Sequence, residues 1–434
     1  MRLARAAACA ALFALSAAAP AARADGNPSP AAGVPVAATT WTLEQVADIA
    51  VRNHPLVRQS DAEIAAAAAR RGQAESPWYP SVNLSTGTSR TRAFSALSQK
   101  STTTPNEFLR GDLSVLIADF GRTRASVNRF DALLSATKEI GGTVREDVAF
   151  AAKVAYFNVL RAGRSLDVRR ETLRRRESLL KQAQAYYEAG IRAKIDVARA
   201  EANLYDARAQ VSQAENDLRV ARITLLNRMG VDGPADYLLS SPLAEEKVPG
   251  TLPDWIAEAE RNRTELATIR QRERAAAESV RFARGGYLPT LSGTAGLGYA
   301  ADEPPLDRNY TVGVTLNYPV FTGFLTREQV REAEASLASV RHELVDARRR
   351  VALQVEQAAY GVREALERID ARRKERDASE ENLRLATARY EVGAGDIIEM
   401  IDAQVQMTVA DTGVIDAQYD YSVSVATLLR AIGR

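Results

Sequence analysis

Four short segments of the chain alternate between apolar and polar residues. In the clearest of them Leu109 and Leu113 fall on one side of the segment, while Arg110 falls on the other. A period of two residues predicts a β-strand with one apolar and one polar face. The strands are expected near residues 81–92, 109–120, 290–300 and 309–321. Segments of about ten residues are long enough for a tilted strand to cross a bilayer, so membrane strands are predicted; a half-buried sheet on a soluble core is the alternative.

Helical spacing dominates the rest of the chain. Apolar residues three or four apart, many of them Ala, run from Arg122 to Tyr187 and again from Thr326 to Tyr390. At about 1.5 Å per residue, each run predicts a rod of about 100 Å, longer than helices of globular domains. Shorter helices are expected near 43–77, 194–228 and 396–430, and basic clusters interleaved with acidic residues predict solvated helix faces.

The chain also contains two copies of one pattern. Pro80 and Pro289 lie at the same offset as Leu43 and Leu252, and the turn at 187–190 has a counterpart at 390–393. A constant offset across turns and helix ends indicates a duplicated unit of about 200 residues. We therefore expect a first repeat at 25–230, a linker at 231–251 and a second repeat at 252–434.

The N-terminus and the composition exclude several function classes. Arg2 and Arg5, an Ala-rich run and an Ala-Arg-Ala site at 22–24 predict an export signal at 1–24. This segment holds Cys9, the one Cys of the chain, and there are two His residues. The sequence has no phosphate-binding loop and no dinucleotide fingerprint. We thus expect no enzyme, no catalytic residue, no cofactor and no metal site, and the nearly balanced charge gives no reason to expect nucleic acid.

Four strands per chain cannot close a membrane barrel, because single-chain barrels begin at eight strands. Two copies would supply eight strands and three copies twelve, and an eight-stranded barrel is filled by its own side chains. The fold expected for a pore is therefore mainly α with a small membrane β-barrel. It has a long antiparallel α-helical barrel, four transmembrane strands per chain and an internal two-fold repeat, and it closes only as a trimer with 12 strands.

Several motifs occur in a fixed order along 41–434. They are Thr42-Leu43-Glu44-Gln45, Asn53-His54-Pro55, Tyr79-Pro80-Ser81, Phe120-Gly121, Phe321-Thr322-Gly323 and the paired Tyr-Glu-x-Gly turns. In this order they resemble the TolC family of outer-membrane efflux and secretion ducts. The resemblance implies a homotrimer in the outer-membrane lipid that extends into the periplasm and works with a periplasmic adaptor and an inner-membrane pump. It also implies that Pro80, Gly121, Pro289 and Gly323 are strand–helix junctions.

The resemblance further implies a gate at the periplasmic tip. Glu399 and Asp402 match acidic positions of the family, and Asp196 is the corresponding acid of the first repeat. Together with Tyr390 they are the expected gate residues, while Gly190 and Gly393 would be turns that face the adaptor. An Arg of the family's closing latch is replaced here by Gly395, and the nearest basic residues are Arg192 and Lys194.

Other functions are compatible with parts of the pattern. A periplasmic adaptor and a structural coiled-coil protein of an envelope complex are also built from long helices, but paired strands in each repeat favour the duct. The sequence leaves the cargo open among drugs, metals and secreted proteins, because Met400 and Met407 are a weak basis for a metal path.

Overall fold

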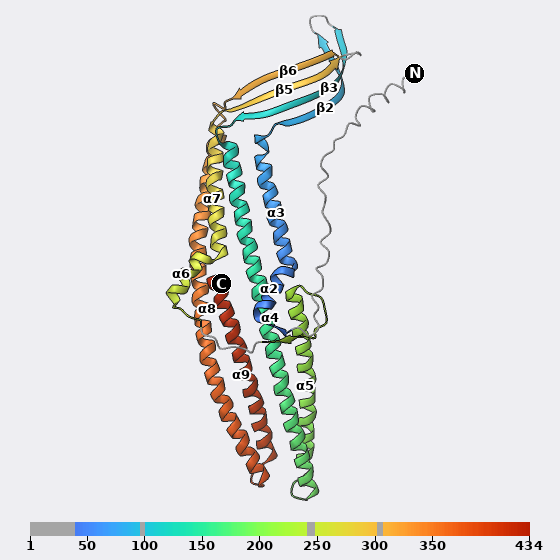
Figure 1. The fold of residues 1–434 in the computed structure, drawn as a ribbon, viewed down its shortest axis with the longest axis vertical. Helices are drawn as coiled ribbons and strands as arrows, with labels where there is room; N and C mark the ends of the chain where they lie inside the picture. Colours follow the sequence, from blue (N-terminus) through green and yellow to red (C-terminus); the bar gives the residue numbers. More distant parts are fainter. Residues whose placement is uncertain (1–39, 96–99, 241–247, 302–306) are drawn as a thin grey trace, which may run out of the picture.

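A computed structural model describes residues 40–95, 100–240, 248–301 and 307–434. The expected export signal at 1–24 lies outside these ranges, as does part of the expected linker at 231–251. The chain is elongated, with a β-sheet at one end and helices along the rest of its length (Figure 1). The shape agrees with the rods that the long helical runs predict.

The helices come in two sets with the same order and the same lengths. The first set is α2 (Leu43–Asn53), α3 (Pro55–Glu75), α4 (Arg122–Glu188) and α5 (Lys194–Met229). The second set is α6 (Leu252–Asn262), α7 (Thr264–Arg284), α8 (Leu325–Glu391) and α9 (Ile397–Ile432). Both α4 and α8 contain 67 residues, in agreement with the two predicted rods.

The single helical region expected at 43–77 is divided in two, which corrects the sequence reading. α2 ends at Asn53 because His54, which precedes Pro55, is extended with φ −64° and ψ 131°. The imidazole Nδ1 of His54 accepts a hydrogen bond from the Leu56 amide at 3.2 Å, so this residue also caps α3. A short 3₁₀ turn, η2 (Ser76–Trp78), then leads to Pro80 and the sheet.

The sheet has four antiparallel strands in the order β2-β3-β5-β6. They are β2 (Ser81–Ser95), β3 (Lys100–Ala118), β5 (Thr290–Ala301) and β6 (Asp307–Asn317). The expected strands near 81–92 and 109–120 left a loop at 93–108, and part of that range is strand instead. Its Thr and Ser residues fit a solvated strand as well as a loop. Conversely, β6 ends at Asn317, before the expected 321, so the apolar residues that follow belong to the turn into α8.

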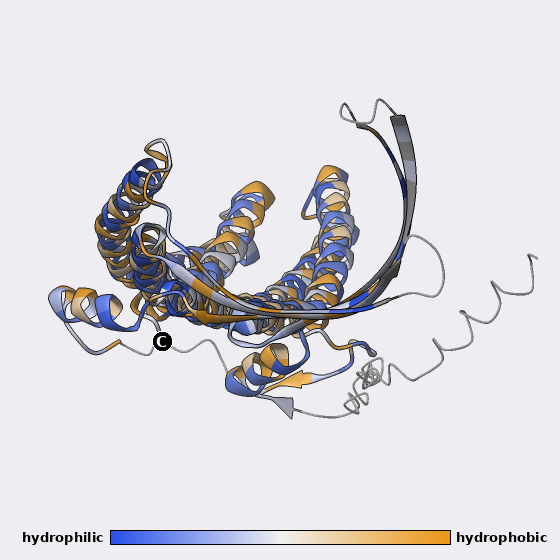
Figure 2. Ribbon diagram, turned by 90° about the horizontal axis from the view of Figure 1, so that it is seen from above, coloured by the Kyte–Doolittle hydropathy of each residue, from blue (hydrophilic) through white to orange (hydrophobic). Residues whose placement is uncertain are grey.

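One face of the sheet is apolar and uncovered. Tyr310, Val312 and Val314 are 67–79% exposed, and Val82 on β2 is 74% exposed. A sheet packed on a soluble core would bury such residues. That alternative is thus wrong for this chain. Seen along the long axis, the sheet is bent into an arc (Figure 2).

The helices pack as two hairpins that contact each other along α4. α4 packs on α5 and α8 on α9, while α7 and α9 both contact α4. Halfway along the long axis of the molecule, α2 packs on α4 and α6 packs on α8. The short strands β1 (Thr40–Trp41) and β4 (Leu238–Leu239) pair in parallel there. Trp41 stacks on Tyr237 with 4.9 Å between ring centroids, which closes the first of these middle cores.

None of the helices in the described ranges combines the length and the apolar character that crossing a membrane requires.

Candidate functional site at the hairpin tips

The two hairpins end in similar turns. Gly190, between α4 and α5, has φ +72°, and Gly393, between α8 and α9, has φ +77°. In each turn the glycine amide donates back to a tyrosine carbonyl, Gly190 to Tyr187 at 3.0 Å and Gly393 to Tyr390 at 3.2 Å. A glycine with positive φ is a common helix C-terminus, so both residues end their long helices. Both are exposed and available to a partner.

An apolar cluster joins the two hairpins directly beneath the turns. Its members come from all four helices, and its buried residues are Leu179, Ala183, Ala200, Tyr390, Ile397 and Met400. Met400 and Met407 are 6% and 4% exposed. Their thioethers are therefore part of the packing between helices, so they do not line a solvent-exposed path.

Arg192 connects the turn of one hairpin with the turn of the other. Its guanidinium donates to the carbonyl oxygen of Gly395 at 2.8 Å and lies 5.2 Å from the centroid of the Tyr390 ring. The Tyr186 hydroxyl also donates across the gap, to the Glu391 carbonyl at 3.4 Å. Gly395 leaves this position without a side chain, and the arginine that reaches it comes from the other half of the chain.

Tyr390 and Asp196 lie at the same point. Tyr390 is fully buried, and within the described part of the chain its hydroxyl has no hydrogen-bond partner. Burial raises the pKa of the Tyr390 phenol, and the nearby Asp196 carboxylate raises it further. Asp196 is itself buried at the start of α5. A buried hydroxyl without a hydrogen-bond partner costs free energy, so the contribution of Tyr390 to this contact comes from its ring, which packs in the apolar cluster.

Glu399 and Asp402 are exposed near the start of α9. Within the described ranges, no hydrogen bond or ion pair joins either of them to Asp196 or Tyr390. Glu399 forms an ion pair with Arg389 on α8, at 3.4 Å. Among the described residues no ion pair or hydrogen bond is found for Asp402. Of the two expected acids, Asp402 therefore presents the less compensated charge.

The four expected junction residues lie where strands and helices meet. Pro80 and Pro289 directly precede β2 and β5, and each follows a 3₁₀ turn, η2 or η3 (Gly285–Tyr287). Gly121 has φ +97° and Gly323 has φ +62°, and each lies at the start of a long helix. The carboxylate of Asp119 accepts from the Gly121 amide at 3.1 Å and from the Thr123 amide at 2.5 Å, which fixes the return into α4.

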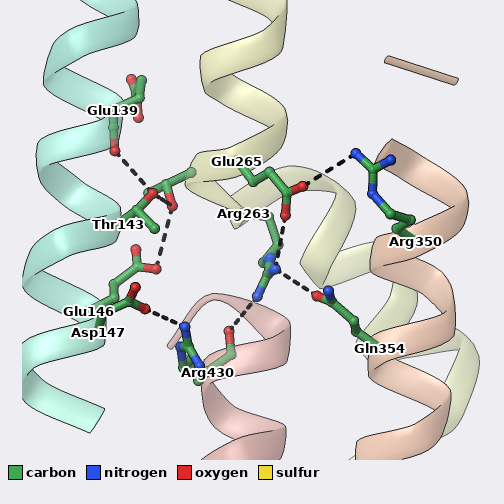
Figure 3. A network of polar contacts seen from close by, with 10 residues as sticks. Glu139, Thr143, Glu146, Asp147, Arg263, Glu265, Arg350, Gln354 and Arg430 are labelled. Atoms are coloured by element: carbon green, nitrogen blue, oxygen red, sulfur yellow. Dashed lines mark hydrogen bonds and ion pairs between the residues drawn. The ribbon is translucent and has the colours of Figure 1, made fainter. Parts of the chain in front are cut away.

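A polar network at the middle of the chain was not found from the sequence. Arg263, at the start of α7, donates to Gln354 at 2.8 Å and to the carbonyl of Arg430 at 3.2 Å (Figure 3). Arg430 in turn pairs with Asp147 on α4. These residues line a pocket of about 770 Å³ in which basic and acidic side chains alternate. The contacts join four helices, α4, α7, α8 and α9, that are far apart in sequence, so no local pattern could reveal them.

The network connects helices through hydrogen bonds and ion pairs. Arg263 pairs with Glu265, and Arg430 pairs with Asp147. The Glu146 carboxyl accepts a hydrogen bond from the Thr264 hydroxyl at 3.5 Å, and burial raises its pKa. Among the described residues, no group of three His, Cys, Asp or Glu could hold a metal ion.

Comparison with known proteins gives a consistent assignment. The chain matches the family described as "Outer membrane efflux protein" over residues 46–231 and 255–434. It is 28% identical to Protein CyaE of Bordetella pertussis, over 88% of this chain and 82% of that protein. It is 24% identical to the outer membrane protein TolC of Escherichia coli, over 90% of this chain and 82% of that protein.

The fold is similar to that of solved structures. A membrane protein from Pseudomonas aeruginosa of known crystal structure superposes with a TM-score of 0.79 at 25% identity, over 90% of this chain and 92% of that one. The family match, the two sets of helices and the sheet with its uncovered apolar face all lead to one assignment: the chain belongs to the outer membrane efflux protein family.

Proposed function

We propose that three copies of this chain form one outer-membrane exit duct, in which twelve strands close a β-barrel that the helices continue into the periplasm. The observation that carries the proposal is the four-stranded sheet. In the described chain β2 and β6 each pair on one side only, and the apolar face is uncovered. Unpaired backbone groups in lipid cost several kcal/mol each, so further copies of the sheet are needed to complete the wall.

The number three follows from the strand count. Two copies would give eight strands, and the interior of such a barrel is filled by side chains. Three copies give twelve strands and leave room for water. The polar face of the sheet supports a water-filled interior, because Ser, Thr, Asn and Gly alternate there with the apolar residues.

The sides of the helices support the same assembly. Tyr205, Val220 and Ile223 on α5 are more than half exposed, as are Leu353 and Tyr360 on α8. These side chains lie along rods that have no partner on that side within one chain. Neighbouring copies would cover them and close the helices into a cylinder.

The tip of this cylinder is the proposed gate. Arg192 and the Tyr390 ring hold the two hairpins of one copy together beside Asp196, and separating the hairpins would open the tip. Glu399 and Asp402, repeated three times around the axis, would form an acidic ring that attracts cations. Gly190 and Gly393 would face a periplasmic adaptor.

In this proposal the duct receives its cargo from an inner-membrane pump through the adaptor. The pump selects the cargo, so small molecules and secreted proteins both remain open. A cleaved export signal at 1–24, repeats at 25–230 and 252–434 and a linker at 231–251 are part of the same proposal.

Planar-bilayer recording of the purified protein tests the proposal. Discrete steps of conductance are expected, because each inserted trimer adds one pore. Insertion without steps, also in a variant with a weakened tip, would contradict it. Deleting the gene and comparing drug sensitivity with the secretion of large proteins would then identify the class of cargo.

A further inference from the structure

Long side chains lie flat on the polar face of the sheet. Residues directly opposite in neighbouring antiparallel strands share a face. Gly87 on β2 is opposite Phe108 on β3, and Gly296 on β5 is opposite Asp112 on β3. Arg110 lies between these two positions of β3 and belongs to the same face. The apolar residues exposed to lipid in the proposed duct alternate with them, so this face lines its interior.

The glycines provide the space in which these side chains lie. A Cβ atom at Gly87 would be 2.8 Å from the ring of Phe108. A Cβ atom at Gly296 would be 2.9 Å from the Asp112 carboxylate and 3.2 Å from the Arg110 guanidinium. The distances of 2.8 Å and 2.9 Å are shorter than real Cβ contacts, and 3.2 Å is tighter than most. The ring and the Arg110–Asp112 ion pair therefore occupy the volume that a larger residue would fill.

An ion pair with Asp112 keeps the Arg110 side chain against the sheet. Its Nε lies 2.6 Å from the Asp112 carboxylate on the same strand. The Phe108 carbonyl accepts from the Thr86 hydroxyl at 2.9 Å, which fixes the backbone beneath the ring. The side chains thus run along the wall and leave the interior clear.

We propose that Gly87 and Gly296 set the free width of the opening inside the β-barrel, because they allow Phe108 and Arg110 to lie against its inner wall. The inference rests on the proposed trimeric duct. In a trimer Gly87 with Phe108 occurs three times around the barrel, and so does Gly296 with Arg110. The two sets lie at neighbouring heights along the barrel axis. A larger residue at Gly87 turns the Phe108 ring into the interior. A larger residue at Gly296 displaces the Arg110–Asp112 ion pair in the same way, so that three copies of the displaced side chain narrow the opening for cargo.

The test uses a cysteine placed deeper in the barrel. Ser114 lies on the same face of β3, is exposed and lies nearer the helical end of the strand than Asp112. Maleimides carrying polymers of increasing size are added outside intact cells that express Ser114→Cys. Cys9 lies in the expected export signal, so this cysteine would be the one thiol of the mature chain. The closed tip does not affect the measurement, because the reagent enters from the opposite end.

Gly87→Val and Gly296→Val are expected to prevent labelling by the largest maleimides that label the Ser114→Cys parent. The smallest maleimide should label both variants at the parent rate, because it passes an opening that excludes the larger ones. Gly313→Val is the matched control, because a Cβ there would lie 3.7 Å from the Thr294 hydroxyl, an ordinary contact. It should keep the parent's size limit.

Two further variants complete the test. Phe108→Ala in the Gly87→Val background should restore the parent's limit, and Phe108→Ala alone should leave it unchanged, because the ring already lies on the wall. An unchanged limit in Gly87→Val and Gly296→Val, or a wider one in Phe108→Ala alone, would overturn the inference. Absence of labelling by the smallest maleimide in the parent would instead contradict the duct itself.

Discussion

Replacing Arg192 by Ala tests how the tip is held closed. The guanidinium makes the 2.8 Å hydrogen bond to the Gly395 carbonyl and lies over the Tyr390 ring, and both partners belong to the other hairpin. Arg192→Ala removes both contacts and leaves the apolar cluster beneath them intact. We expect the closed arrangement of the hairpins to become less favourable.

The size of the effect follows from these two contacts. A hydrogen bond to a charged group contributes about 1.5–3 kcal/mol, and a cation over an exposed ring about 0.5–1 kcal/mol. Arg192 is half-buried, so the lower end applies, about 2 kcal/mol for each copy. About 1.4 kcal/mol corresponds to a factor of ten in an equilibrium constant. The equilibrium constant for separating the two hairpins of one copy therefore rises about 30-fold.

Single-channel recording in planar bilayers measures this shift as a rise in open probability or mean conductance. Lys194→Ala is the control, because Lys194 is exposed at the start of α5, close to Arg192 in sequence, and its substitution removes the same charge. Arg192→Lys should fall between the wild type and Arg192→Ala, since Lys keeps the charge but loses the planar group. An Arg192→Ala channel that behaves like Lys194→Ala would refute the reasoning.

Three further changes have expected outcomes. Gly230→Ala should lower the free energy of unfolding by about 1–3 kcal/mol, measured as a lower thermal midpoint, because φ is +65° there and a Cβ would lie 2.8 Å from the backbone of His54. Gly72→Ala, in open space on α3, should not lower the midpoint. Asp402→Asn should reduce cation selectivity, measured as the reversal potential in a salt gradient, more than Glu399→Gln does. The reason is that the Glu399 carboxylate is already paired with Arg389, and equal effects of the two variants would contradict it. Burial raises the pKa of Glu146, so its charged form destabilises the folded chain above that pKa, and this destabilisation disappears as the pH falls. Glu146→Gln should therefore raise the thermal midpoint at neutral pH but not below about pH 4. An equal gain at both pH values would argue against burial as the cause.

Local patterns were sufficient for the elements. The long helices were predicted almost to the residue, because Ala-rich periodic spacing is sustained between a Gly-containing return and a Gly turn. The strands were predicted from their alternation, although β3 begins at Lys100, earlier than the expected 109. There the residues are Thr, Ser and Asn, and their polarity does not separate a solvated strand from a loop.

Contacts between distant segments could not be predicted. The role of Arg192 depends on the position of Gly395 in the other half of the chain, and the network around Arg263 depends on how α7 meets α4 and α9. The break after Asn53 did have a signal, since the residue before a proline disfavours helix. The gate residues Glu399, Asp402, Asp196 and Tyr390 were found through family resemblance, and their roles remain predictions. Membership of the outer membrane efflux protein family sets aside the adaptor and coiled-coil readings.

The most direct measurement of the central claim is the stoichiometry of the protein extracted from outer membranes. Native mass spectrometry in detergent should give a complex of three chains, because the free edges of β2 and β6 are completed by neighbouring copies. A single chain, or a stable pair, would leave the sheet open or its barrel too narrow for water, and would contradict the account.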